Sequence, residues 1–511
     1  MTSVSRRLAL ATTAAPPPQP SHGGNGRRQC WECQRRRVVC DAARPVCGKC
    51  KATGVVCPGY EDKKPLTWLT PGKVKTRTWK RKKPSDKDAS PKSSSSEDGS
   101  DTTKSSSNVS TQLVHIFPGV ELRSETCDFV EATMYWNDQV YPSFLANQLT
   151  SSPWVIPVTY IHLMPRATQH ALVSMAIDHR MLRIGRRKND PFIVEVQSRF
   201  HQHRCAAIQA LNEDVNNDRI RGADSTFGSV MVFMFADLMG SATTANWRHH
   251  LNGLAGLMAM RGGFEVMFRT TPYLHPLLLF PKIVEVMANT TSPAHDQVGP
   301  TTSYKNIDMI SELFQLGYYP LLPCPVELFA DIIRINRLRF LIATNSWSED
   351  LGSVQSAAEN LVESIIEFSP EIWVESKTDS KEMFLLMGRV YQSATALYAI
   401  SSLQCLGALP LSAGWKAVRT IHYGRLFALL DQAANEPMVK HCVAWPLIVA
   451  GFEAASGSAA GRAFVVKQCI TSSKDLGAYL PLAAVRVLET FWASGKRTWD
   501  ECFDTPHALV A

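Results

Sequence analysis

The chain of 511 residues is 45% hydrophobic and 20% charged, which is the composition of globular proteins and excludes a fibrous or wholly disordered chain. Its net charge of +8 is unevenly distributed, because residues 27–83 hold 17 Lys and Arg against four Asp and Glu, and residues 84–511 hold 35 against 42. No run of about 18 uncharged apolar residues occurs, so we expect no membrane partner. The asymmetry predicts a small polyanion-binding module beside a domain with another role.

Residues 1–26 are rich in Ala, Thr, Pro and Gly, and they predict a disordered tail. The same stretch contains Arg6 and Arg7 and no acidic residue, so it also weakly resembles a mitochondrial presequence. Its apolar run LALA is too short for a secretory signal. We therefore expect the cysteines to lie in a reducing compartment, where disulfides are disfavoured.

Six cysteines follow within residues 30–57, in the pattern C-x2-C-x6-C-x6-C-x2-C-x6-C. Two cysteines three residues apart can direct both sulfurs to one metal at the first turn of a helix. Two separate zinc ions would need eight thiolates, and six are enough if two of them bridge both ions. Such a closed site leaves no position for water, which predicts a structural role and no hydrolysis. The predicted ligands are Cys30, Cys33, Cys40, Cys47, Cys50 and Cys57.

This spacing, with the basic run QRRR after the second cysteine, Pro45 before the fourth and Gly54 before the sixth, resembles the fungal zinc binuclear cluster (Zn2Cys6) DNA-binding domain. The resemblance implies two short helices around two Zn²⁺ ions over residues 27–60. It also implies that Cys30 and Cys47 bridge the ions. The alternatives are a different zinc knuckle, a thiol-rich metal store or a secreted disulfide framework.

Arg35, Arg36 and Arg37 follow the second cysteine after Gln34, so we expect them on the exposed side of the first helix. Arginine can donate two hydrogen bonds to guanine O6 and N7 in the major groove. The resemblance implies that basic residues of this helix contact a CGG triplet, at the positions of Arg36 and Arg37. Val39 departs from the family, where a basic residue is common, and this puts one backbone contact in doubt.

Other basic residues of the cluster region are predicted to contact phosphates, which add affinity without sequence information. The alternative for each is a solvated surface charge. These residues are Arg27, Arg28, Arg44, Lys49 and Lys51.

Residues 61–83 predict a basic linker that ends in the run Lys80, Arg81, Lys82 and Lys83, which suits nuclear import or non-specific DNA contact. Trp68 and Trp79 within it either pack on the cluster or stack. Residues 84–121 are Ser-rich and predict a disordered linker. Acidic residues three positions after serines in SSSSEDGSD also suit phosphorylation, which would add negative charge near the basic segment.

Residues 122–511 predict one all-α domain, because apolar residues recur at intervals of three and four and strand-like alternation is rare. An irregular stretch is expected around residues 264–308, and no heptad repeat indicates a coiled coil. The predicted helical segments are 129–145, 167–185, 191–211, 227–240, 249–263, 325–343, 356–368, 383–401, 417–434, 445–455 and 482–495.

This body contains no GxGxxG, P-loop, HExxH or GxSxG motif. Cys205, Cys324 and Cys442 lack ligand spacing and are expected to be buried thiols. His249 and His250 are adjacent, so on a helix they would diverge and could not easily share a metal.

The body resembles the fungal-specific regulatory domain of the acriflavine sensitivity control type. The resemblance is carried by YWNDQVYP (135–142), HHLNGLAGLMAMRGG (249–263), WPLIVAGFEAA (445–455) and ETFWASGKRTWDECF (489–503). It implies regulation and names no effector.

Two functions fit these features. The first is a sequence-specific transcription factor of the RNA polymerase II system in a fungal nucleus. It would bind double-stranded DNA with CGG sites and act on the transcription machinery, as a homodimer on paired triplets or as a monomer. The second is an enzyme or metabolic protein whose cysteine module only docks or stores metal. The cluster favours the first, and activation and repression are both compatible with it.

Overall fold

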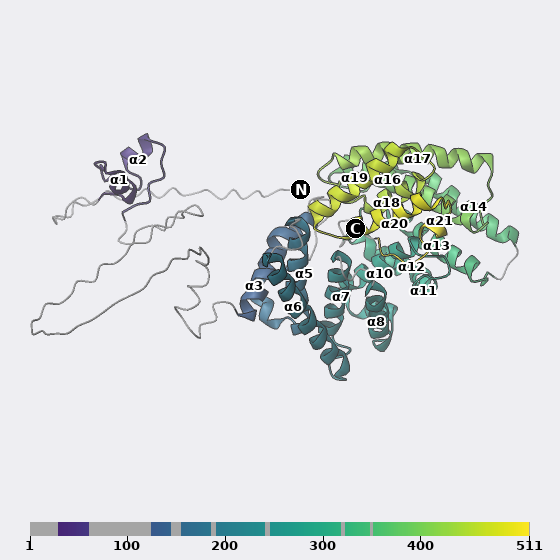
Figure 1. The fold of residues 1–511 in the computed structure, drawn as a ribbon, viewed down its shortest axis with the longest axis horizontal. Coiled ribbons are helices and arrows are strands. Elements are labelled where there is room, and N and C mark those ends of the chain that lie inside the picture. The colour runs from purple at the N-terminus through teal and green to yellow at the C-terminus, as the bar shows by residue number, and fades with distance from the viewer. Residues whose placement is uncertain are drawn as a thin grey trace, which may run out of the picture. The chain divides into compact units, whose positions relative to one another are not determined.

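The computed structural model divides the chain into two units, residues 1–107 and 108–511 (Figure 1). No strand is assigned in the parts of the chain that the structure describes, and none of their helices is long and apolar enough to cross a membrane. The predicted fold class, a small cysteine-rich domain followed by a large all-α domain, is confirmed. The described residues are 29–60, 124–144, 155–184, 191–240, 246–317, 322–347 and 351–509.

The cysteine-rich domain is built from two structurally equivalent halves, one around helix α1 (Trp31–Arg36) and one around α2 (Gly48–Ala52). Each helix begins after a cysteine whose Sγ accepts a hydrogen bond from the backbone amide of the next cysteine. Seven residues after the first cysteine of each half the backbone has positive φ, at Arg37 (56°), which caps α1, and at Gly54 (64°), which follows Thr53 at the end of α2. The repeat seen in the cysteine spacing is therefore a repeat of backbone conformation.

All regular elements of the second unit are helices within the described residues. In chain order they are α3 (Glu125–Tyr135), the π-helix η1 (Trp136–Val140), α4 (Tyr141–Phe144), the 3-10 helix η3 (Val158–Leu163), α5 (Arg166–Ile184), α6 (Pro191–Asn216), α7 (Asp224–Met239), α8 (Trp247–Met260), α9 (Phe264–Thr270), the 3-10 helix η5 (Pro272–Leu274), α10 (His275–Thr290), α11 (Pro300–Lys305), α12 (Ile307–Gln315), α13 (Val326–Ala343), α14 (Leu351–Glu367), α15 (Pro370–Glu375), α16 (Lys381–Cys405), α17 (Ala413–Ala434), α18 (Ala444–Glu453), α19 (Ala459–Leu476), α20 (Leu480–Ser494) and α21 (Trp499–Cys502).

Helix α16 lies at the centre of this unit. Eighteen of its 25 residues are buried, and it packs against α13, α14, α15, α17, α18 and α21. A helix that is apolar on all sides is buried, and a small residue is needed where a neighbour approaches closely, as at Gly388, where a Cβ would lie 3.1 Å from Pro370. The main apolar core forms around this helix.

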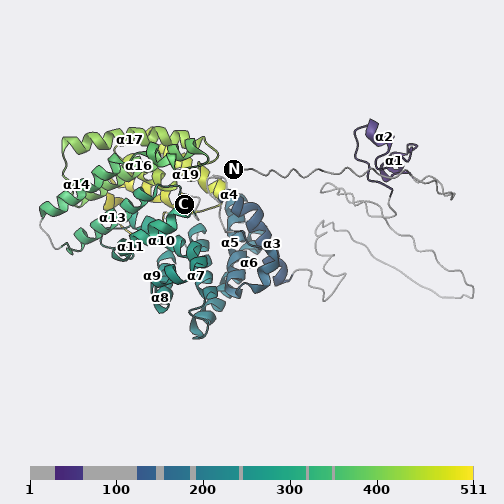
Figure 2. The same ribbon diagram turned by 180° about the vertical axis from the view of Figure 1, so that it is seen from behind.

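Helices α3, α5 and α6 lie at one end of the unit, and α14 lies at the other end (Figures 1 and 2). A second apolar cluster holds α3 and η1 against α5, with Phe129, Trp136 and Leu172 among its buried members. Within the described residues the unit therefore has a main core and two smaller apolar clusters, one of α3, η1 and α5 and one between α5, α6 and α7.

The expected irregular stretch at 264–308 is wrong over most of its length. Residues Phe264–Thr270 and His275–Thr290 are helical, and α10 continues through Pro281. The prediction failed because Gly and Pro punctuate this stretch, and proline is well tolerated at the first turn of a helix, as in α10 and α11. The segment 291–299, between α10 and α11, is irregular and largely buried.

A buried arginine ties that irregular segment to the end of the chain. Arg339 donates from Nη1 to the carbonyl of Asn289 (3.0 Å) and to the hydroxyl of Tyr398 (2.9 Å). It donates from Nη2 to the carbonyl of Ser292 (3.0 Å) and to Asp500 Oδ1 (2.6 Å). Carbonyls that a helix or strand would otherwise satisfy are thus satisfied by one side chain.

Candidate zinc cluster and DNA-binding surface

The sulfurs of the two halves converge on one another. Cys30 Sγ lies 3.7 Å from Cys47 Sγ and 3.8 Å from Cys50 Sγ, and Cys33 Sγ lies 3.6 Å from Cys47 Sγ and 4.0 Å from Cys50 Sγ. All four cysteines are buried. Cys40 and Cys57 pack against them and are half-buried. The structure thus brings together all six predicted ligands.

This arrangement fits zinc. Sulfurs placed tetrahedrally at about 2.3 Å from one Zn²⁺ lie about 3.8 Å apart, which matches the sulfur separations at the centre of the cluster. The first cysteine of each half contacts both cysteines of the other half, which is compatible with the predicted bridging by Cys30 and Cys47. A pair of shared sulfurs is what two ions held by six thiolates require.

The thiols differ in how readily they ionise. Burial raises the pKa of Cys30, and it raises the pKa of Cys33 strongly and that of Cys50 to about 12. At Cys40 burial also opposes ionisation, but hydrogen bonds from the amides of Cys30 and Ala42 outweigh it and lower the pKa to about 6. Because a metal binds thiolates, loading this site releases protons and weakens as the pH falls.

Side chains outside the cysteines hold the loops in place. Both carboxylate oxygens of Asp41 accept from the amide of Gly48 (3.0 and 2.8 Å), and a Cβ at position 48 would collide with that carboxylate. Tyr60 donates to the carbonyl of Ala43 (2.7 Å), and its hydroxyl lies 3.8 Å from Cys40 Sγ. These contacts hold the loop between the halves at Asp41 and Ala43.

The three arginines of the run at the end of α1 have different surroundings, although all are exposed. Arg35 donates from Nε (2.9 Å) and Nη2 (2.7 Å) to the carboxylate of Glu32. Arg36 donates from Nη1 to Thr53 Oγ1 (3.0 Å), at the end of α2. Arg37 occupies the left-handed position that ends α1. The three arginines are equivalent in the sequence prediction, but in the structure each has a different partner or backbone conformation.

The basic residues predicted to contact phosphate are exposed where the structure describes them. The Arg44 guanidinium lies 5.3 Å from the centre of the Tyr60 ring, and Lys49 and Lys51 lie on α2. Within residues 29–60, six Lys and Arg face two Asp and Glu, and those two carboxylates bond Arg35 and the backbone at Gly48. Arg27, Arg28 and the run from Lys80 to Lys83 lie outside the described residues.

Several residues that shape this surface were missed at the level of sequence. Glu32 and Arg35 stand three apart on a helix, which was a readable signal for an ion pair. Tyr60 and Thr53 carried no such signal, because their partners lie 17 residues away in the chain.

In the helical unit, the candidates from the sequence do not form a joint site. His250 Nε2 lies 2.8 Å from Asp237 Oδ2, and Arg204 bonds the other oxygen of Asp237, whereas His249 is exposed. Cys324 and Cys442 are buried as expected. The expectation for Cys205 is wrong, because it lies on the exposed side of α6.

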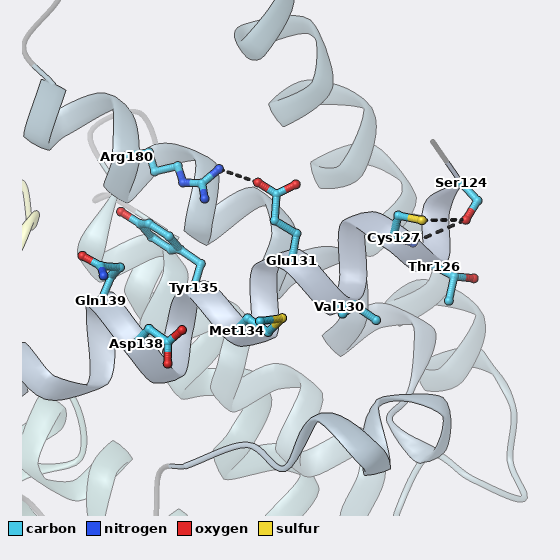
Figure 3. Close-up of a pocket in the computed structure, with 10 residues that line it drawn as sticks. All are labelled: Ser124, Thr126, Cys127, Val130, Glu131, Met134, Tyr135, Asp138, Gln139 and Arg180. Atoms are coloured by element: carbon cyan, nitrogen blue, oxygen red, sulfur yellow. Dashed lines mark hydrogen bonds and ion pairs between the residues drawn. The ribbon is translucent and has the colours of Figure 1, made fainter. Parts of the chain in front are cut away.

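An open pocket of about 570 Å³ lies along α3 (Figure 3). Arg180 reaches into it from α5, pairs with Glu131 (2.7 Å) and lies 4.3 Å from the centre of the Tyr135 ring. Its charged groups are therefore largely paired with one another. The lining residues are Ser124, Thr126, Cys127, Val130, Glu131, Met134, Tyr135, Asp138, Gln139 and Arg180.

A thiolate site for zinc with an exposed basic helix, followed by a separate all-α unit, defines the class of DNA-binding transcription regulators. The profile of the fungal Zn(2)-Cys(6) binuclear cluster domain matches residues 28–66, and that of the fungal specific transcription factor domain matches residues 132–505. The chain belongs to this family of zinc-binding, fungal-specific transcription factors. The family is one of regulators and not of enzymes, and the acriflavine-type subclass stays a prediction.

Two curated proteins illustrate the relationship. The phomenoic acid biosynthesis cluster-specific transcriptional regulator of Leptosphaeria maculans is 32% identical over 95% of this chain and 89% of its own length. The aspercryptin biosynthesis cluster-specific transcription regulator of Emericella nidulans is 44% identical over 54 residues, 11% of this chain and 8% of its own length. No solved structure matches the chain significantly.

Proposed function

We propose that this chain is a nuclear regulator of RNA polymerase II transcription that recognises CGG triplets in double-stranded DNA. Two Zn²⁺ ions would be held by Cys30, Cys33, Cys40, Cys47, Cys50 and Cys57, with Cys30 and Cys47 bridging them. The ions supply the fold of the module, and the protein surface supplies recognition. The basic run from Lys80 to Lys83 would direct nuclear import.

The observation that carries the DNA-binding proposal is the hydrogen bonding of the Arg36 side chain. Its Nε and Nη2 donate to no described residue, and the side chain is exposed at the end of α1. Two adjacent N–H donors match guanine O6 and N7. We assign base readout to Arg36 and Arg37. Phosphate contact is assigned to the surrounding basic residues Arg27, Arg28, Arg35, Arg44, Lys49 and Lys51.

Competition binding with the zinc-loaded full chain tests this assignment. We expect Arg36→Ala and Arg37→Ala each to reduce the preference for CGG over scrambled DNA by about 1–3 kcal/mol. Lys49→Ala should weaken binding to CGG and to scrambled DNA equally, and it should lower the salt dependence of binding by about one counterion. Unchanged discrimination in both arginine variants would show that the assignment is wrong.

One triplet is too short to select a site in a genome, so we propose that a homodimer reads paired triplets. Footprinting of genomic sites shows their number, spacing and orientation. Protection of a single triplet, together with a monomer in sedimentation, would contradict the dimer.

The relatives' names suggest the target class. We propose that this chain regulates the genes of a biosynthetic cluster, because a regulator named for such a cluster matches nearly its whole length. Genome-wide mapping of bound sites tests this, and sites scattered without any such cluster would exclude it.

A further inference from the structure

We propose that Thr53 is a positioning residue for DNA readout. Its hydroxyl, at the end of α2, holds the Arg36 guanidinium by Nη1 and leaves the Nε–Nη2 edge directed outward for guanine. This inference rests on the proposed role of Arg36 and adds the residue that makes Arg36 selective. Thr53 itself need not touch DNA.

The hydroxyl of Thr53 has a fixed orientation. Its single proton is donated to the carbonyl of Lys49 (2.9 Å), with the carbonyl of Cys50 also within reach (3.3 Å). Because the proton is committed to the backbone, the lone pairs point away from α2 and can only accept. Arg36 Nη1 donates to this oxygen at 3.0 Å. The contact joins the end of one half of the cluster to the end of the other.

Arg35 provides an internal comparison. Its Nε and Nη2 form the same edge that a guanine would need, and both donate to Glu32. Arg36 is bound at a different atom, so its corresponding edge has no partner among the described residues. The Nε–Nη2 edge is thus occupied in Arg35 and available to a guanine in Arg36.

An arginine that is already anchored by a hydrogen bond should discriminate between CGG and scrambled DNA better than an unrestrained arginine. An unrestrained arginine loses side-chain entropy when it binds a base, and anchoring through Nη1 removes part of that loss before DNA arrives. The benefit applies only where the two donors find O6 and N7. Removal of the anchor should therefore reduce affinity for CGG about 2- to 10-fold and leave scrambled DNA nearly unchanged.

The test uses the zinc-loaded full chain and competition binding to CGG and scrambled DNA. Thr53→Val keeps the shape and removes the acceptor, and Thr53→Ser keeps the acceptor. We expect Thr53→Val to lower the CGG preference and Thr53→Ser to restore it, with the same salt dependence in both. In the Arg36→Ala background, Thr53→Val should cause no further loss. Glu32→Gln serves as the matched control, because it releases Arg35 and should leave the CGG preference intact.

The outcomes separate this inference from the proposed function. If Arg36→Ala loses discrimination and Thr53→Val does not, the positioning role is wrong and the function stands. If Arg36→Ala keeps the preference for CGG, then the assignment of base readout to Arg36 and the positioning role of Thr53 are both wrong. The Co²⁺-substituted spectrum monitors the cluster, and a changed spectrum in Thr53→Val would assign Thr53 a structural role and overturn the inference.

Discussion

The two units of this chain are stabilised by different means. In the cysteine-rich domain, the buried apolar residues within 29–60 are Cys30, Cys33, Cys47 and Cys50 alone. In the helical unit, one helix, α16, buries 18 residues. A module so small cannot bury enough apolar surface to fold without a staple, whereas the helical unit can. A few ligands therefore determine the fold of the cysteine-rich domain, and packing distributed over many residues determines that of the helical unit.

Removal of metal should separate the two units most strongly, because only the cysteine-rich domain is predicted to depend on it. Structural zinc contributes about 10–16 kcal/mol in small zinc modules, so chelation should unfold the cluster and abolish DNA binding. The helical unit should keep its far-UV circular dichroism, because all six predicted metal ligands lie in the cysteine-rich domain. Cys47→Ser should have the same effect as chelation.

Cys205→Ser is the control for that experiment, because Cys205 is exposed and lies outside the cluster. DNA binding that survives full chelation would contradict a metal-dependent fold.

The helical unit should respond to the loss of one buried charge. Arg339→Met removes the donor to the carbonyls of Asn289 and Ser292 and to Asp500 Oδ1. Breaking such a network costs about 3–5 kcal/mol, so the midpoint of chemical unfolding of the helical unit should fall. Arg219→Met, at an exposed position, should leave it unchanged.

CGG binding by the Arg339→Met protein should persist at low temperature if the two units fold separately. Loss of binding there, with the cluster still loaded, would show that the units depend on each other.

The two units could be predicted from the sequence to different extents. Metal-ligand chemistry imposes its spacing directly on the chain, so the six cysteines and the paired helices were predictable. Helical periodicity revealed most of the second unit. Helix α19 was missed because polar residues interrupt its apolar face. The Arg339–Asp500 pair joins positions 161 residues apart, and no local pattern specifies such a partner.

Acid should weaken the helical unit through buried histidines. Burial lowers the pKa of His179, His422 and His441 to about 4, with nearby cations adding to the effect. The unfolded state, with a pKa near 6.5, binds the proton more readily. Stability is therefore fully present above about pH 6.5 and is lost as the pH falls toward 4, by at most about 3 kcal/mol per histidine.

Urea unfolding of the chelated protein between pH 4 and 7 measures this effect without the cluster. His422→Leu should flatten the pH dependence, and the exposed His249→Gln should not. An identical slope in both variants would exclude His422 as a source of the acid sensitivity.

The smallest expected effect lies in the cluster and concerns the two equivalent helix ends. Arg37 adopts the left-handed conformation that Gly54 adopts in the other half. A non-glycine residue pays about 1 kcal/mol or more there, so Arg37→Gly should slightly raise the stability of the zinc-loaded module while reducing its preference for CGG. Gly54→Ala should lower stability by a similar amount and leave the preference unchanged.

Metal exchange from Zn²⁺ to a competing chelator measures the stability in both variants, and competition binding measures the preference. Because the metal contributes about ten times more than this strain, the fold can tolerate an arginine where a glycine would fit best. Opposite shifts of stability and specificity in Arg37→Gly would show that this helix end is kept for DNA readout at a cost in stability. A loss of both properties would show instead that Arg37 supports the module itself.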